Sequence, residues 1–137
     1  MDNKKLQVPS TKFQTNSNFQ TPDEKPKIYD LAERTFRFAS QIIKFCNQLS
    51  NSISNRELTK QLIRSAGSVG ANYIEANEAL TKKDFRHKIM ICLKEAKESH
   101  YWLKLVKNSN DDANDKYDAL IQESRELVKI FSAILNK

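Results

Sequence analysis

The stretch RELTKQLIRSAGSVGANYIEANEAL, residues 56–80, decides the fold. Apolar residues recur in it at intervals of three and four, the spacing that places side chains on one side of an α-helix. These positions are Leu58, Leu62, Ala66, Val69, Tyr73, Ala76 and Leu80. We therefore predict an amphipathic helix over residues 56–80, with one side buried against other helices.

Two glycines lie in the middle of this helix. Gly67 and Gly70 each cost up to about 1 kcal/mol relative to alanine in a helix interior. One interpretation is that another backbone approaches closely at this patch of small side chains, and the other is a local kink. Just beyond them, Asn72 and Glu75 could form a polar network that fixes the register of the helix. Alternatively, Glu75 pairs with a base on a neighbouring helix.

Three further segments have the same periodicity and are predicted as helices. The first covers residues 30–49, the next residues 81–107, and the last ends at Leu135. The first contains Leu31, Thr35, Phe38, Ile42, Phe45 and Leu49, and its stripe is widened by Ala39, Ile43 and Cys46. The connections are expected at residues 50–55 and 108–115, and they are short enough to join antiparallel neighbours.

Capping residues mark two of the expected helix starts. Ser54 or Asn55 can cap the helix that follows the first connection, because their short polar side chains accept hydrogen bonds from free backbone N–H groups. Thr81 can cap the next helix, with Asp84 at the third following position as in a capping box.

The composition supports an all-α fold. The 137 residues include two glycines and three prolines, and all three prolines lie within the first 26 residues. A chain so poor in turn-forming residues argues against β-sandwich and α/β folds. We predict an up-down-up-down antiparallel four-helix bundle over residues 28–137. Residues 1–27, rich in polar residues and proline, are predicted to be a disordered tail.

Other features of the sequence indicate the cellular compartment. Neither a signal peptide nor an apolar run of about 20 residues is present, so we predict a cytoplasmic protein that does not enter the membrane. Cys46 and Cys92 lie among apolar neighbours in expected helices, and we interpret them as buried, reduced thiols.

Positive charge is concentrated in the segment 81–108. The chain has a net charge of +6, and this segment has eight Lys or Arg against three Asp or Glu. Seven of these basic residues fall within an arc of about 140° on a helix of 3.6 residues per turn. They are Lys82, Lys83, Arg86, Lys94, Lys97, Lys104 and Lys107. Such a stripe is typical of phosphate binding without base specificity, although a solvated lysine-rich surface that serves solubility has the same pattern.

The same helix has a second apolar side. Ile91, Trp102 and Leu105 lie away from its main stripe, and a soluble monomer gains nothing from a second apolar side. We therefore predict a subunit interface there, with burial of Trp102 in the core of the monomer as the alternative.

Catalytic and metal sites are not indicated. A bundle di-iron site needs two Glu-x-x-His pairs, and Glu75-x-x-Glu78 and Glu95-x-x-Glu98 lack the histidines. The only histidines are His87 and His100, and the sequence has no Gly-rich turn that would present a Ser or Cys nucleophile for either of them to activate. We predict neither an enzyme nor a bound cofactor or metal.

Four stretches together resemble a known family. They are QLIRSAGSVGANYIEA at 61–76, KKDFRHKI at 82–89, LKEAKE at 93–98 and YWL at 101–103. In this order and spacing they resemble the bacterial four helix bundle protein family, which includes proteins encoded in intervening sequences of large-subunit ribosomal RNA genes. The sequence is also similar to the accessory variability proteins of diversity-generating retroelements.

The resemblance implies a protomer that assembles into a ring, typically a homopentamer. In the retroelement relatives it further implies a basic ring that binds RNA or DNA and a reverse transcriptase, and it implies no catalytic residues. The sequence thus leaves two hypotheses: a ring-forming bundle that binds nucleic acid, or a structural module that binds only proteins.

Overall fold

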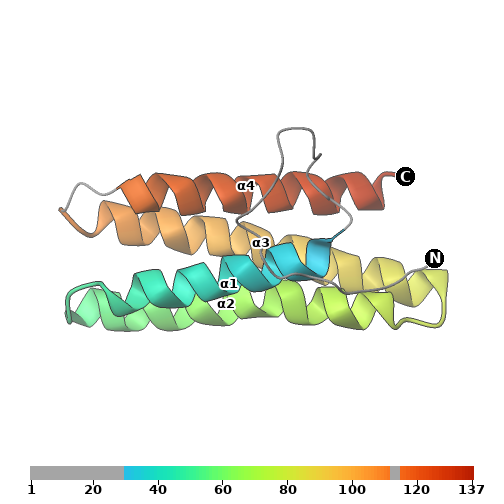
Figure 1. Cartoon of the computed structure of the whole chain (residues 1–137), viewed down its shortest axis with the longest axis horizontal. Helices are drawn as coiled ribbons and strands as arrows, with labels where there is room; N and C mark the ends of the chain where they lie inside the picture. Colours follow the sequence, from blue (N-terminus) through green and yellow to red (C-terminus); the bar gives the residue numbers. More distant parts are fainter. Residues whose placement is uncertain (1–29, 112–114) are drawn as a thin grey trace, which may run out of the picture.

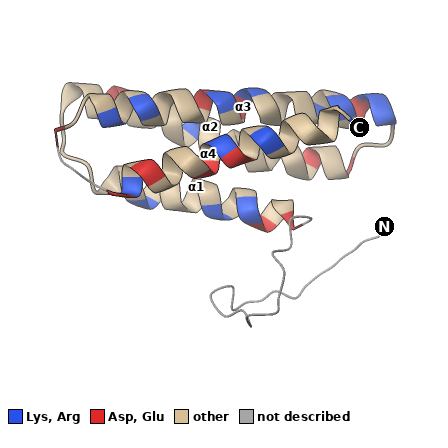
Figure 2. Cartoon of the chain, turned by 90° about the horizontal axis from the view of Figure 1, so that it is seen from above, with Lys and Arg blue, Asp and Glu red and all other residues tan. Residues whose placement is uncertain are grey.

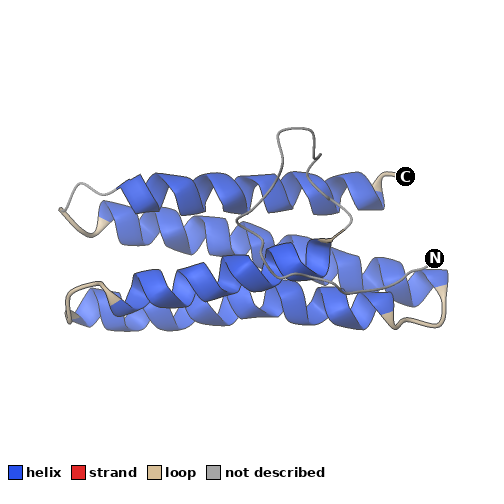
Figure 3. Cartoon of the chain, viewed as in Figure 1, coloured by secondary structure: helices blue, strands red, loops and turns tan. Residues whose placement is uncertain are grey.

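The computed structural model describes residues 30–111 and 115–137, which form four helices (Figure 1). These are α1 (Leu31–Asn47), α2 (Ile53–Asn77), α3 (Lys82–Asn108) and α4 (Asp115–Leu135). Consecutive helices run antiparallel and pack against each other, and α1 meets α4 to close the bundle. No strand occurs in the described part of the chain (Figure 3). The predicted all-α up-down-up-down bundle is confirmed, whereas the predicted tail lies outside the described residues.

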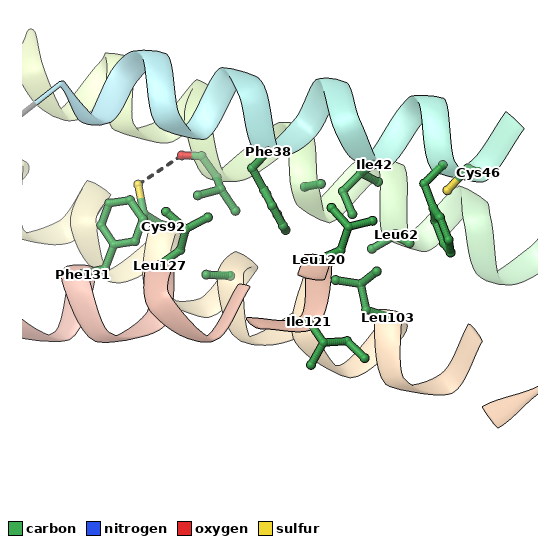
Figure 4. Close-up of a cluster of buried hydrophobic side chains, with 14 of the residues drawn as sticks. Phe38, Ile42, Cys46, Leu62, Cys92, Leu103, Leu120, Ile121, Leu127 and Phe131 are labelled. Atoms are coloured by element: carbon green, nitrogen blue, oxygen red, sulfur yellow. Dashed lines mark hydrogen bonds between the residues drawn. The ribbon is translucent and has the colours of Figure 1, made fainter. Parts of the chain in front are cut away.

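The core forms where the four apolar stripes meet, as expected from their periodicity (Figure 4). Phe45 and Tyr117 bring α1 and α4 together with their rings edge to face, 4.9 Å apart. The largest fully buried apolar side chains of the core are Phe38, Ile42, Leu62, Val69, Ile89, Leu103, Val106, Tyr117, Leu127 and Phe131. None of the helices described here has the length and apolarity needed to cross a membrane.

The most extensive contact in the bundle joins α2 and α3. The thiol of Cys92 donates a hydrogen bond to the carbonyl oxygen of Val69 at 3.4 Å (Figure 4). The hydroxyl oxygens of Ser65 and Ser99 lie 2.9 Å apart, and both side chains are fully buried. Burial raises the pKa of Cys92 to about 12 and that of Cys46 to about 11. Both cysteines are free and buried, as the sequence predicted, and the raised pKa values favour the protonated thiols.

The start of α2 differs from the prediction. Ser52 caps the helix by accepting a hydrogen bond from the N–H of Asn55 at 3.0 Å, so α2 begins at Ile53 and the predicted cap at Ser54 or Asn55 is wrong. Asn55 is instead buried, and its side chain exchanges two hydrogen bonds with that of Asn110, at 3.0 and 2.9 Å. Asn55 thus ties together the two loops at one end of the bundle.

The start of α3 follows the prediction, because the hydroxyl of Thr81 accepts a hydrogen bond from the backbone N–H of Asp84 at 3.0 Å.

Two residues that the sequence placed in the core are exposed. Leu80 is 96% exposed because α2 ends at Asn77 and the helical period no longer applies beyond it. Ile43 is 43% exposed because it faces outward at the edge of the α1 stripe.

The two glycines of α2 have different surroundings, although the helix continues without a break through both. A β-carbon at Gly70 would lie 3.0 Å from the hydroxyl oxygen of Thr35 on α1, which supports the close-approach interpretation there. A β-carbon at Gly67 would have nothing within 4 Å.

The polar residues beyond the glycines act separately. The side-chain amide of Asn72 donates to the carbonyl of Ser68 at 2.8 Å. Glu75 accepts from Lys88 of α3 at 2.5 Å, so its pairing with a base on a neighbouring helix is confirmed. The proposed network between Asn72 and Glu75 is wrong, because each side chain takes a different partner.

Candidate nucleic-acid interface

Lys and Arg residues are spread along α3 (Figure 2). All seven basic residues of the predicted stripe are exposed. The outermost positions follow one another at intervals of seven, four, three, four and three residues, which keeps them on one side of the helix. We call these positions the outer face of α3: Lys83, Met90, Lys94, Lys97, Tyr101 and Lys104.

Two residues of the predicted stripe are engaged within the bundle. Arg86 donates to the backbone carbonyl of Leu135 at 2.8 Å, and Lys107 pairs with Asp118 at 2.7 Å. Both contacts join α3 to α4. Within the part of the chain that the structure describes, the other five stripe residues have no ion pair or hydrogen-bonded side-chain partner: Lys82, Lys83, Lys94, Lys97 and Lys104.

Two open hollows lie along this side of α3 and adjoin at Met90. The first, at the N-terminal end of the helix, is lined by Lys82, Lys83, Arg86, His87 and Met90. The second is lined by Met90, Leu93, Lys94, Lys97, Glu98 and Leu135. Since both combine basic and apolar side chains, they suit a ligand that is anionic on one side and apolar on the other.

On the α4 side of this surface, His100 lies near two basic side chains. The pKa of His100 is lowered by partial burial and by the nearby charges of Arg125 and Lys104. Its ring Nδ1 lies 3.0 Å from the hydroxyl oxygen of Ser124 on α4. Two acidic side chains of α3, Glu95 and Glu98, contact Arg64 of α2, and Glu98 also lines the second hollow.

Arg64 contacts two carboxylates of α3. Its guanidinium lies 2.7 Å from Glu98 and 3.3 Å from Glu95, which is 6% exposed. These ion pairs raise the pKa of Arg64, chiefly through Glu95. The pair of carboxylates is thus occupied by a cation from the chain itself. No group of three His, Cys, Asp or Glu that could hold a metal occurs among residues 30–111 and 115–137.

The two aromatic residues in this part of α3 differ in exposure. Tyr101 is 57% exposed, whereas Trp102 is partly buried and packs against the core. Their rings lie edge to face with centroids 5.0 Å apart. The indole N–H of Trp102 is buried and has no acceptor in the described chain. Ile91 and Leu105 are also partly exposed, and the role of Ile91, Trp102 and Leu105 as a subunit interface stays a prediction.

Comparison with known families decides the relationship of this chain. The model of the 23S rRNA-intervening sequence protein matches residues 27–133, which include all the helices except the end of α4. The chain belongs to the 23S rRNA-intervening sequence protein family. The predicted membership in the bacterial four-helix bundle family is thereby confirmed, while the similarity to retroelement accessory proteins stays a prediction.

A solved structure of this kind of protein has the same fold. The crystal structure of a Bacteroides thetaiotaomicron protein of unknown function from the S23 ribosomal protein family superposes with a TM-score of 0.69 at 30% sequence identity. The alignment covers 78% of this chain and 99% of that chain. The curated proteins gave no match.

A second exposed surface of this chain could not be predicted from the sequence periods alone. Phe36 is 69% exposed, Ile74 54% and Ile43 43%. Phe36 follows Thr35, the residue that lies against Gly70, and Ile74 lies one turn beyond Gly70. We call Phe36, Ile43 and Ile74 the α1/α2 apolar face. The sequence signal was limited to the seven-residue spacing of Phe36 and Ile43, which places them on one side of α1.

Proposed function

We propose that this protein binds nucleic acid without base specificity through the outer face of α3. The observation that carries the proposal is the row of lysines on that face that have no acidic partner among the described residues. Lysines that are free of internal ion pairs can neutralise phosphates and release the counterions condensed on a polynucleotide. No arrangement in the described residues indicates catalysis.

The proposal includes assembly into a ring, with a homopentamer as the expected form. A closed ring of more than two copies needs two different patches on each copy, one for each neighbour. Two patches support this arrangement: the α1/α2 apolar face, and the sequence-predicted interface of Ile91, Trp102 and Leu105. In a ring the outer face of α3 is repeated around the axis, so the positive fields of the copies add. A reverse transcriptase or another protein that acts on RNA or DNA is the expected partner of such a ring.

The nucleic-acid half is tested with a triple variant, Lys94→Ala with Lys97→Ala and Lys104→Ala. Binding to single-stranded RNA is measured by fluorescence anisotropy over a range of salt concentrations. We expect much weaker binding, and a slope of log K against log salt that is smaller by about two units, because each lost phosphate contact removes about 0.7.

The matched control is Arg37→Ala with Lys44→Ala and Lys60→Ala. These exposed residues lie on α1 and α2, and their removal changes the net charge by the same amount. The control is expected to bind nearly as well as the parent. If the two triple variants bind alike, only net charge matters and the outer face of α3 is not the site.

The assembly half is tested by light scattering. We expect the parent protein to have the molar mass of about five protomers. The double variant Phe36→Ser with Ile74→Ser is expected to have a smaller molar mass. A monomeric parent contradicts the ring. A parent that assembles but binds no nucleic acid at low salt contradicts the first half and leaves a protein-interaction module, which the α1/α2 apolar face favours.

A further inference from the structure

We infer that the outer face of α3 takes single-stranded nucleic acid, and that Tyr101 is the side chain on which an unpaired base stacks. This inference rests on the proposed function and goes beyond it, because it selects the strandedness of the ligand and assigns a base contact to one residue.

The position of Tyr101 among the lysines is the first argument. Tyr101 follows Lys94 by seven residues and Lys97 by four, and it precedes Lys104 by three. Residues at these spacings are neighbours on one side of a helix, so Tyr101 has lysines on both sides of it along α3. A strand whose phosphates contact these lysines therefore passes its bases over the ring.

The exposure of Tyr101 is the second argument. The ring is 57% exposed although it sits on a helix whose other large aromatic side chains, Phe85 and Trp102, are partly buried. It is held from one side by the edge-to-face contact with Trp102, 5.0 Å between centroids. A supported ring with an open surface suits stacking, because it loses little conformational freedom when a base covers it.

The chemistry of the ligand decides between single and double strands. In a duplex the planes of the bases are already covered by their neighbours, so a tyrosine on the surface of a helix reaches only backbone and groove edges. Unpaired bases expose their planes and stack on aromatic side chains regardless of sequence. The apolar lining of the adjoining hollow, with Met90 and Leu93 beside Lys94 and Lys97, is compatible with the same ligand.

The test compares Tyr101→Leu with the parent in the full-length protein. The probes are a uridine oligonucleotide and the RNA duplex that it forms with an adenosine strand of equal length. We expect Tyr101→Leu to bind the single strand roughly tenfold more weakly, the usual scale for loss of one stacked base, and to bind the duplex like the parent. Tyr101→Phe keeps the ring and is expected to bind like the parent.

The matched control is Ile53→Ala, which removes an exposed apolar side chain from the start of α2, outside both the outer face of α3 and the α1/α2 apolar face. It is expected to leave the affinity for the single strand unchanged. Trp102 gives a second readout, because it is the only tryptophan and its ring contacts that of Tyr101. Its emission is expected to change when the uridine oligonucleotide saturates the protein.

The outcomes separate this inference from the proposed function. If the single strand binds the parent and Tyr101→Leu equally well, or if Trp102 emission stays constant at saturation, the stacking role is overturned and the basic surface stands. Equal loss of duplex and single-strand affinity in Tyr101→Leu also overturns it. If neither probe binds the parent at low salt, the proposed function itself fails.

Discussion

Helix α2 has a closed side and an open side, and each carries one of the two glycines of the chain. On the closed side, Gly70 lies against Thr35 of α1 and Ser65 against Ser99 of α3. On the open side, Gly67 has nothing within 4 Å of its missing β-carbon, and Ile74 is 54% exposed. The two glycines are less than one turn apart. Packing therefore requires glycine at position 70, whereas glycine at position 67 only weakens the helix.

The difference shows what sets the distance between α1 and α2. Because Gly70 has no side chain, the backbone of Thr35 can approach to the point where an added β-carbon would lie 3.7 Å from its carbonyl carbon. The hydroxyl of Thr35 is turned back onto its own helix, where it donates to the carbonyl of Leu31 at 2.9 Å. Small side chains and internally satisfied hydroxyls thus make the closed side tight.

The largest effect is expected from Gly70→Val. The added side chain has to displace Thr35 or push α1 away, because its β-carbon alone would lie 3.0 Å from the Thr35 hydroxyl oxygen. Overpacking of this kind costs about 1–3 kcal/mol of unfolding free energy, and we expect a value near the upper end. Urea unfolding followed by circular dichroism measures it.

Thr35→Ala is the control for this contact. It removes the hydroxyl oxygen that the added side chain would meet, while the carbonyl of Leu31 keeps its place in the helix. In combination with Gly70→Val, it is expected to restore part of the lost stability. If the losses of the two single variants simply add, the contact with Thr35 is not the source of the cost.

A smaller effect is expected from Ser65→Ala, on the side of α2 that faces α3. The hydroxyls of Ser65 and Ser99 are within 2.9 Å, and each also lies near a helix carbonyl: Leu62 at 3.2 Å for Ser65 and Glu95 at 2.9 Å for Ser99. Ser99 therefore keeps an acceptor when Ser65 is replaced, and we expect a loss of about 1 kcal/mol. Thermal unfolding measures the loss.

The double variant Ser65→Ala with Ser99→Ala sharpens the interpretation. Removing both hydroxyls leaves no buried polar group without a partner, so the double variant should lose less stability than the sum of the single variants. Additive losses would show that the two hydroxyls contribute independently and that the pair does not hold α2 to α3.

The sequence predicted the helices and the exposed stripe because both depend on local periodicity. The 3.6-residue period places Leu62 and Leu103 in the core and Lys94 and Lys97 on the surface whatever the partners are. It also predicted the Thr81 cap, since the capping residues are adjacent in the chain.

The sequence did not distinguish Gly67 from Gly70, because only the position of α1 makes one of them necessary. For the same reason it missed the pairing of Arg64 with Glu95 and Glu98, which brings α2 and α3 together over more than 30 positions of sequence. The predicted burial of Leu80 was wrong for a different reason. The apolar spacing in the sequence continues past Asn77, but the helix ends there.

The smallest effect is expected from Gly67→Ala, and it has the opposite sign. Alanine in a helix interior is favoured over glycine by up to about 1 kcal/mol, and no neighbour within 4 Å opposes the added β-carbon. Urea unfolding should show a modest gain in stability. A loss would mean that Gly67 is covered in the assembled protein. Gly67→Gln then decides the point: reduced assembly in light scattering, with unfolding stability retained, would show that a second copy closes the side of α2 that is open in the single chain.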